Sequence, residues 1–387
     1  MRAIMKKSRE PGLAMGEVPR PEVAPNEVLV KVRLAGICGT DVHIHKWDDW
    51  AQGRIKPPVV LGHEFVGEVA ESGRLVSDLK PGTLVTAEGH IGCGTCTLCR
   101  TGHSHVCRDT RILGVDTDGA FAEYVRVPAT NVWPIEPGIP IEWAAIHDPL
   151  GNAFHAVLTA DVPGKSVLVT GCGPIGLFSI GIARAAGAAR VFASEVDPQR
   201  REMAKREGAD QVIDPRRENL EEIVRDETRG DGVHVVLEMS GNPDAVRQGL
   251  QVARNSGRVQ WFGIPEDPIA LDLAKLVIFK GLTIYGVTGR LMYETWYEMR
   301  NFLISGRYDP SGVITHRVPL ARFEEAIAAA AAGHSGKVIL DISGNNGPGP
   351  GGGSGGKRGR RSDGEGLRGT IKPGGSTPGD DSPGESR

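Results

Sequence analysis

The sequence predicts an α/β protein that combines a doubly wound parallel sheet, the Rossmann arrangement, with a second, β-rich domain. From about residue 165 to residue 291, strand-like apolar runs alternate with helical stretches, which is the pattern of parallel strands joined by helical crossovers. A glycine-rich turn follows the first of these strands. Residues 1–150 instead contain short, irregularly spaced strands that Gly and Pro interrupt. The 387 residues suffice for two hydrophobic cores, because one core seldom grows past about 250 to 300 residues.

The β-rich domain is expected to comprise residues 1–150 and 292–341, with strands at 28–34 and 65–70. An amphipathic stretch at 292–303 is expected to lead the chain back to it. Residues 151–291 are expected to form the dinucleotide-binding domain. Its predicted strands are 166–170, 190–194, 211–213, 233–237, 258–262 and 282–287, and its predicted helices include 175–186, 198–207 and 243–254.

Residues 342–387 differ in composition from the rest of the chain, since 16 of them are Gly, 5 are Pro and none is aromatic. Such a segment buries too little apolar surface to offset its ordering entropy, so we expect disorder. The basic cluster at 357–361 would suit a nucleic-acid-binding arm. However, seven basic and five acidic residues leave this tail at only +2, which favours a solvated appendage and makes nucleic acid an unlikely partner.

The overall composition is that of an ordinary globular protein, with 40% hydrophobic and 24% charged residues. The net charge of -3 favours neither nucleic acid nor an anionic membrane surface. No apolar run approaches the roughly 20 residues that cross a bilayer. The first residues, Met1-Arg2-Ala3-Ile4, contain no apolar stretch typical of a secretory signal. We therefore expect a cytoplasmic protein without a membrane segment.

Four cysteines, Cys93, Cys96, Cys99 and Cys107, follow the spacing C-x2-C-x2-C-x7-C. Four thiolates this close can enclose one zinc ion in a closed, structural site. Disulfides would need an oxidising compartment, and an iron-sulfur run would have a final gap of three residues followed by proline. Two histidines in the last gap, at 103 and 105, could replace one cysteine as ligand, but four thiolates are the simpler set.

A second group of metal-binding residues, Cys38, His63 and Glu64, lies upstream of the quartet. This mixed thiolate, imidazole and carboxylate set is typical of a catalytic zinc with one open coordination position. An alcohol oxygen at such a position loses its proton more easily. The chain is therefore expected to bind two zinc ions, one structural and one catalytic, which indicates an enzyme.

The glycine-rich turn follows the pattern G-x-G-x-x-G, with its glycines at Gly171, Gly173 and Gly176. These glycines and Ile175, which precedes the last of them, are expected coenzyme-binding residues. The turn lies between a predicted strand and a predicted helix, where a helix N-terminus can bind a pyrophosphate. Glu195 follows 19 residues later, at the end of the second strand, where an acid accepts hydrogen bonds from the adenosine ribose. Its charge disfavours a 2'-phosphate, so NAD is predicted over NADP. Further expected coenzyme contacts are Arg200, Phe262, Gly263, Ile264, Val287 and Thr288, although Arg200 with Arg201 keeps NADP as an alternative.

The segment Gly62-His63-Glu64, followed by Gly67 and Gly73, resembles the signature of the zinc-containing medium-chain alcohol dehydrogenases, and the cysteine quartet resembles their structural zinc lobe. The resemblance extends from about residue 1 to 341 and implies a GroES-like fold for the β-rich domain. It also implies a proton relay through Thr40 and His43 and a further essential acid at Asp148. Asp148 could ligate zinc, exchange with Glu64 or act as a nearby charge, and the sequence does not choose among these roles.

Further segments resemble the branch of that family that oxidises L-threonine; they lie at 37–44, 47–50, 88–90, 148–152, 289–290, 294–297 and 314–317. The resemblance implies oxidation of L-threonine to L-2-amino-3-oxobutanoate with NAD, by a homotetramer, in threonine degradation. A polyol or butanediol dehydrogenase is the alternative among enzymes. A non-enzymatic, zinc-stabilised nucleic-acid-binding protein is the alternative from another class, but an open zinc site at Cys38, His63 and Glu64 argues against it.

Overall fold

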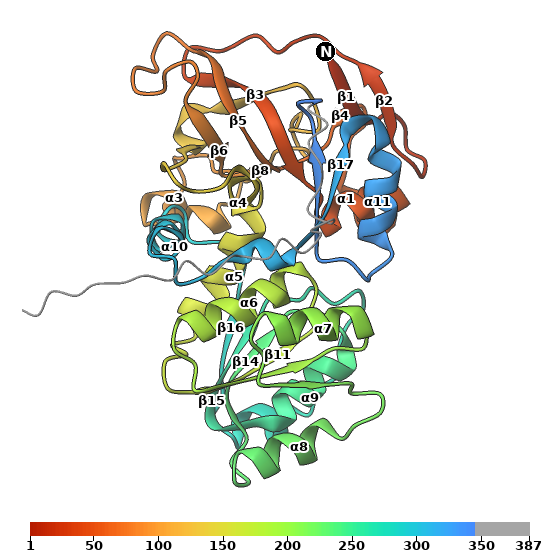
Figure 1. Ribbon diagram of the computed structural model, residues 1–387, viewed down its shortest axis with the longest axis vertical. Coiled ribbons are helices and arrows are strands. Elements are labelled where there is room, and N and C mark those ends of the chain that lie inside the picture. Colours follow the sequence, from red (N-terminus) through yellow and green to blue (C-terminus); the bar gives the residue numbers. More distant parts are fainter. Residues whose placement is uncertain (345–387) are drawn as a thin grey trace, which may run out of the picture. The chain divides into compact units, whose positions relative to one another are not determined.

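The computed structural model describes residues 1–344, and the predicted tail at 345–387 lies outside the described residues. A six-stranded sheet occupies the lower half of Figure 1, and every strand pair in it is parallel. The strand order is β13-β12-β11-β14-β15-β16, the doubly wound order 3-2-1-4-5-6. The strands are β11 (Ser166–Thr170), β12 (Arg190–Ser194), β13 (Gln211–Ile213), β14 (Val233–Glu238), β15 (Ala253–Trp261) and β16 (Thr283–Gly286). The predicted parallel sheet and its six strands are confirmed.

Helices cover both faces of this sheet, namely α6 (Pro174–Ala185), α7 (Pro198–Arg206), α8 (Leu220–Glu227) and α9 (Pro243–Val252). Alternate side chains of β11 therefore enter different cores: Val167 and Val169 pack in a cluster with α6, whereas Leu168 packs with α8 and α9. Helices α7 and α9 each begin with a side-chain cap followed by proline. For example, the Asp197 carboxylate accepts a hydrogen bond from Arg200 N at 2.9 Å at the start of α7.

A seven-stranded, mostly antiparallel sheet organises the β-rich part of the chain, in the path β10-β6-β5-β3-β18-β17 with β9 on β3. Its strands are β3 (Glu27–Gly36), β5 (Glu64–Ser72), β6 (Leu84–Ala87), β9 (Tyr124–Pro128), β10 (Val132–Pro134), β17 (Ile314–Pro319) and β18 (Lys337–Asp341). Strand β18 pairs antiparallel with β3, so the last described segment lies in the sheet built by the first residues. Ile342, assigned to the tail from composition, is buried, and its N–H donates to Arg33 O at 3.0 Å.

Smaller elements complete the β-rich part. Strands β1 (Arg2–Lys6), β2 (Ala14–Glu17) and β4 (Val59–Val60) form a three-stranded sheet, and β7 (His90–Ile91) pairs with β8 (Arg111–Ile112). The short helices are α1 (Gly39–Lys46), α2 (Asp49–Arg54) and α3 (Thr97–Arg100), and α11 (Phe323–Ala331) packs against α1 and β18.

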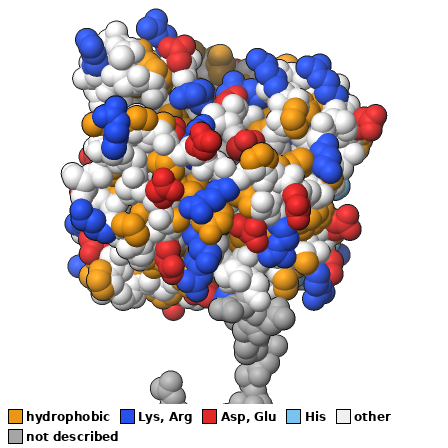
Figure 2. Space-filling model, turned by 90° about the horizontal axis from the view of Figure 1, so that it is seen from above, with side chains coloured by type: hydrophobic (Ala, Val, Ile, Leu, Met, Phe, Trp, Pro, Cys, Tyr) orange, Lys and Arg blue, Asp and Glu red, His pale blue; other side chains and the backbone are white. Residues whose placement is uncertain are grey.

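Three further helices connect the two sheets: α4 (Ile141–Ala145), α5 (His147–Leu158) and α10 (Glu294–Ile304). Helix α5 packs against both α6 and α10, and its Phe154 and Val157 belong to the same core as Val167 of β11. Across residues 1–344, no helix has the length and apolar character required to span a membrane. Basic and acidic side chains are interspersed on the face shown in Figure 2, as the small net charge predicts.

Candidate active site

The four cysteines of the quartet converge in one lobe, and their sulfur atoms lie within 4.8 Å of one another. All four are free thiols, and Cys96 Sγ lies 3.8 Å from Cys107 Sγ. A tetrahedral zinc with Zn–S bonds of about 2.3 Å would separate its sulfurs by about 3.8 Å, so the spacing fits zinc and excludes a disulfide. Backbone N–H groups donate to these sulfurs, as Cys96 N does to Cys93 Sγ at 3.4 Å. Hydrogen bonds from Thr95 and Cys96 lower the pKa of Cys93 to about 6, which favours the thiolate that binds metal.

A second donor cluster forms where α1 and β5 begin. Cys38 precedes α1, His63 and Glu64 enter β5, and their donor atoms lie within 4.8 Å of one another. The sharp approach requires Gly62, whose φ is +94° and at which a Cβ would lie 2.3 Å from the Phe121 ring. His63 is buried, and its Nδ1 has no hydrogen-bond partner among the described residues. A thiolate and a buried imidazole whose Nδ1 has no partner among the described residues together fit a zinc ion.

Glu64, the third member of this cluster, is already paired with a buried lysine. Lys337 Nζ donates to Glu64 Oε1 at 2.7 Å, lies 2.5 Å from Oε2 and also donates to Ile37 O at 2.7 Å. Burial by itself would lower the pKa of Lys337, but the Glu64 and Cys38 charges outweigh it and raise that pKa, so the lysine stays charged. Lys337 therefore competes with a metal for the Glu64 carboxylate, whereas Cys38 has no such competitor.

Asp148 belongs to a different network, centred on the fully buried Arg290. Arg290 Nη2 lies 2.6 Å from Asp148 Oδ2, and the same guanidinium forms a two-point ion pair with Glu88 in which Nε donates to Oε2 at 2.7 Å. Nη1 also donates to Asn152 Oδ1 at 2.9 Å. Burial alone would raise the pKa of Glu88, but the Arg290 charge outweighs it and lowers that pKa to about 2. The acids Glu88 and Asp148 thus both pair with one guanidinium, and His90 completes a donor group whose atoms lie within 4.8 Å of one another.

The two residues of the expected proton relay lie on α1, directly after Cys38. Thr40 Oγ1 lies 3.7 Å from Cys38 Sγ, which places a hydroxyl beside the donor cluster. His43 lies one turn further along α1, and its Nδ1 is 2.5 Å from Asp48 Oδ2. The His43 side chain is about half exposed (49%). A proton that reaches its imidazole can therefore leave to solvent.

The glycine-rich turn adopts the geometry of a dinucleotide site at the carboxyl edge of the parallel sheet. Gly171 has φ of +83°, and a Cβ on Gly176 would lie 2.0 Å from Gly171 O. Gly173 is the N-cap of α6 and offers no side-chain cap, which leaves N–H groups of the first helical turn available to a pyrophosphate. The buried Glu195 carboxylate accepts hydrogen bonds from Cys172 N at 2.7 Å and from the next turn, and it lies at the end of β12 beside this loop.

The remaining expected coenzyme residues lie along the same edge of the sheet. Phe262 N and Gly263 N both donate to Glu238 O, and Val287 N donates to Trp261 O at 2.9 Å. Ile264 and Thr288 are exposed. Arg200 instead donates from Nε to Ser335 O at 3.2 Å, a contact with the segment that leads into β18.

Comparison with known proteins agrees with this geometry. Residues 24–137 match the alcohol dehydrogenase GroES-like domain family, and residues 174–305 match the zinc-binding dehydrogenase family. The chain is 49% identical over 341 residues to an L-threonine 3-dehydrogenase of Caldanaerobacter subterraneus, a match that covers 88% of this chain and 98% of that protein. The chain belongs to the zinc-dependent medium-chain alcohol dehydrogenases.

Solved structures of dehydrogenases have the same fold. The alcohol dehydrogenase of Thermus sp. ATN1 superposes with a TM-score of 0.81 at 33% identity, covering 88% of this chain and 99% of that one. The 2R,3R-butanediol dehydrogenase of Bacillus subtilis gives a TM-score of 0.79 at 26% identity, covering 88% and 99%. The expected GroES-like and Rossmann folds, zinc binding and a nicotinamide coenzyme are thus properties of this dehydrogenase family.

Three residues that organise this dehydrogenase site could not be found by local sequence reasoning. Lys337 meets Ile37 and Glu64 from the other end of the chain, and no local pattern marks it. Arg290 lies in a segment that resembles the family, but its partners are more than a hundred residues away. Glu238 ends the apolar strand β14, and its buried carboxylate accepts hydrogen bonds from Ser240 N at 2.9 Å and Gly241 N at 3.1 Å. Of these three residues, Glu238 has a local sequence signal, because it is an acid at the end of an apolar strand.

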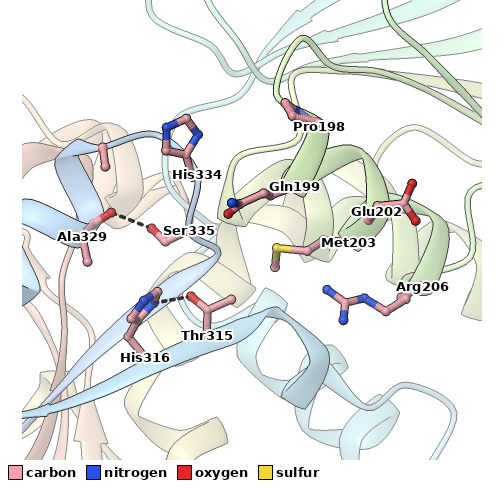
Figure 3. A pocket seen from close by; sticks show the side chains of 11 residues that line it. Pro198, Gln199, Glu202, Met203, Arg206, Thr315, His316, Ala329, His334 and Ser335 are labelled. Atoms are coloured by element: carbon pink, nitrogen blue, oxygen red, sulfur yellow. Dashed lines mark hydrogen bonds between the residues drawn. The ribbon is translucent and has the colours of Figure 1, made fainter. Parts of the chain in front are cut away.

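A cavity also lies away from these residues in this dehydrogenase. A space of about 720 Å³ opens between α7 and the segment formed by β17 and α11 (Figure 3). Met203, Thr315 and His316 line it, and no predicted metal ligand or coenzyme residue does. The His334 side chain at its rim reaches across to Asp197, with 2.5 Å between Nδ1 and Oδ2.

Proposed function

We propose that this dehydrogenase oxidises the 3-hydroxyl group of L-threonine with NAD, giving L-2-amino-3-oxobutanoate and NADH in threonine degradation. The observation that carries this proposal is the match, at 49% identity over 88% of this chain, to proteins named L-threonine 3-dehydrogenase. The butanediol dehydrogenase shares the fold but only 26% of its residues with this chain.

We propose two zinc sites per chain. Cys38 and His63 would hold the catalytic zinc with Glu64 or water, and the cysteine quartet would hold the structural one. When bound at the first site, zinc supplies Lewis acidity toward the alcohol oxygen. Asp148 would not ligate it directly, because its carboxylate is engaged by Arg290, and we assign it the role of a fixed negative charge near His63. Residues 1–150 and 292–341 would form the zinc-binding catalytic domain, and residues 151–291 the NAD-binding domain.

The chain's own residues would carry the proton and direct the hydride. The Thr40 hydroxyl accepts the proton of the substrate alcohol and passes its own proton to His43, whose exposed imidazole releases it to solvent. Residues at the carboxyl edge of the parallel sheet would hold NAD, which when bound would supply the acceptor for the C3 hydride. Glu195 favours NAD, because its buried carboxylate would accept hydrogen bonds from ribose hydroxyls and repel a 2'-phosphate.

We also propose that copies of the chain assemble, in a homotetramer, through the open edge of the six-stranded sheet. Strand β16 ends the sheet, and all four of its residues, including Ile284 and Tyr285, are exposed. An unpaired edge with apolar side chains is suited to pairing with another copy. The six free cysteines support a reducing compartment, and we place the enzyme in the cytoplasm.

The test of the substrate is NADH formation by the zinc-loaded protein with L-threonine, sorbitol, 2,3-butanediol and ethanol as separate substrates. The proposal predicts that L-threonine has the highest kcat/KM of the four. A clear preference for 2,3-butanediol or sorbitol would replace it with the polyol or butanediol dehydrogenase. A protein that binds zinc but produces NADH with none of the four would contradict it as well.

A further inference from the structure

The turn between α1 and α2 brings a carboxylate against the relay histidine. Asp48 is the N-cap of α2, and its Oδ1 accepts a hydrogen bond from Ala51 N at 3.0 Å. Its other oxygen, Oδ2, lies 2.5 Å from His43 Nδ1. One side chain therefore begins one helix and holds an imidazole on the preceding helix.

The surrounding residues fix this arrangement. Trp47 ends α1 in the left-handed conformation with φ of 60°, and its N–H donates to His43 O at 2.9 Å. Gln52 Nε2 in α2 donates to Trp47 O at 2.9 Å, which ties the second helix to the turn. The Trp50 ring meets the imidazole edge to face, with 6.2 Å between ring centroids. The His43 ring is thus held by Asp48 on one side and by Trp50 on another.

We propose that Asp48 is a positioning residue for the proton relay, which holds His43 with a proton on Nδ1 so that Nε2 is the basic nitrogen. The inference rests on the proposed function of His43. In the relay step, Nε2 accepts the proton that Thr40 passes on while Nδ1–H stays bonded to Asp48. The imidazolium then releases the Nε2 proton to solvent, and the ring returns to its starting tautomer.

Neither a helix cap nor a surface ion pair by itself accounts for the contacts of both carboxylate oxygens of Asp48. A helix cap uses one carboxylate oxygen, and here Oδ1 alone serves it. An exposed ion pair stabilises a fold by only about 0 to 1 kcal/mol. Although partial burial opposes it, the hydrogen bonds from Ala51 N and His43 lower the pKa of Asp48, so the group is an anion at neutral pH. An anion aimed at Nδ1 selects the tautomer that carries its proton on Nδ1.

The test is a double-mutant cycle on the full-length, zinc-loaded enzyme with Asp48→Asn, His43→Ala and the double variant. Asparagine is also a good N-cap, so Asp48→Asn keeps the start of α2 and removes the charge. We expect kcat to fall about 10-fold, within the roughly 100-fold that a general base contributes, while the KM values for NAD and L-threonine stay unchanged. Zinc content and the Kd for NADH should also stay unchanged, and the solvent deuterium isotope effect on kcat should rise. In the His43→Ala background, Asp48→Asn should have no further effect on kcat.

The matched control is Asp309→Asn, because Asp309 also caps a short helix, accepting from Ser311 N at 2.8 Å, without a histidine partner. This control should keep its kcat. If Asp48→Asn lowers kcat equally with and without His43, or leaves wild-type kcat unchanged, Asp48 does not act through the histidine and the inference is wrong. If His43→Ala itself retains full kcat, the proposed relay fails, and the inference about Asp48 fails with it.

Discussion

Replacing Glu207 with glutamine should change the way stability depends on pH. Glu207 follows α7, and its Oε2 accepts a hydrogen bond from the Tyr308 hydroxyl at 3.0 Å, which joins the dinucleotide-binding part to the segment after α10. Burial raises the pKa of Glu207 to about 7, despite the opposing effect of the Tyr308 hydrogen bond. The unfolded chain would ionise this carboxyl near its ordinary value of 4.5.

The sign and size of the stability change follow from the folded and unfolded pKa values of Glu207. Between about pH 4.5 and about pH 7 the folded protein binds more protons at this site than the unfolded chain, so the contribution of Glu207 to stability falls as pH rises. A pKa difference of about 2.5 corresponds to about 3 kcal/mol as an upper limit, at 1.36 kcal/mol per pKa unit. Glutamine keeps an oxygen for Tyr308 and has no charge. Glu207→Gln should therefore be more stable than wild type above neutral pH, by roughly 1 to 3 kcal/mol.

Urea unfolding of the zinc-loaded protein at about pH 5 and about pH 8 measures this difference. The gain from Glu207→Gln should be small at the lower pH and larger at the higher one. Glu202→Gln provides a control on the same helix, because Glu202 is exposed and forms a surface ion pair with Lys205. A Glu207→Gln protein that is less stable than wild type at the higher pH, or whose gain in stability does not change with pH, would show that the burial of Glu207 does not destabilise its charged form.

Four other substitutions test the zinc sites, the coenzyme site and the sheet edge. Cys38→Ser should abolish turnover and remove one zinc with little loss of stability. Cys96→Ser should instead lower the unfolding midpoint, because closed zinc sites contribute directly to folding. Metal analysis and thermal unfolding of both variants would show whether the structural and catalytic sites have been assigned the wrong way round. Glu195→Ala should weaken NAD binding and reduce the preference for NAD over NADP, measured as the ratio of the two kcat/KM values. A wild-type enzyme that prefers NADP would contradict the role of Glu195 in selecting NAD. Ile284→Lys should shift the assembly to smaller species in light scattering, since a charge on an exposed edge strand opposes pairing, and an unchanged mass would argue against this interface.

Local chemistry made much of the fold predictable. Helices α6, α7 and α9 and the parallel strands other than β15 appear close to their predicted bounds, because apolar periodicity and proline or glycine at helix ends are local signals. Strand β15, predicted at 258–262, instead begins at Ala253. The convergence of the cysteine quartet was also predictable, since its members lie close in the sequence. Helix α9 ends at Val252 rather than near 254, because the chain passes directly into β15 without a loop.

The parts of the site that depend on distant contacts were not predictable from the sequence. The pairing of Glu64 with Lys337 requires β18 to lie beside β3, which only the sheet topology establishes. The engagement of Asp148 by Arg290 likewise depends on how the loop after β16 meets α5. Sequence reasoning left three roles open for Asp148, because none of its neighbours in the chain reveals a buried arginine from residue 290.

The most direct test of zinc-dependent L-threonine oxidation is to compare kcat/KM for L-threonine with kcat/KM for 2,3-butanediol. NAD is the coenzyme, and zinc content is measured on the same sample. We expect NADH formation that requires zinc at the Cys38 site and a preference for L-threonine of about 100-fold or more, which corresponds to about 2.7 kcal/mol in transition-state binding. A zinc-replete enzyme that oxidises 2,3-butanediol as well as or better than L-threonine, or that keeps its rate after Cys38→Ser, would contradict this expectation.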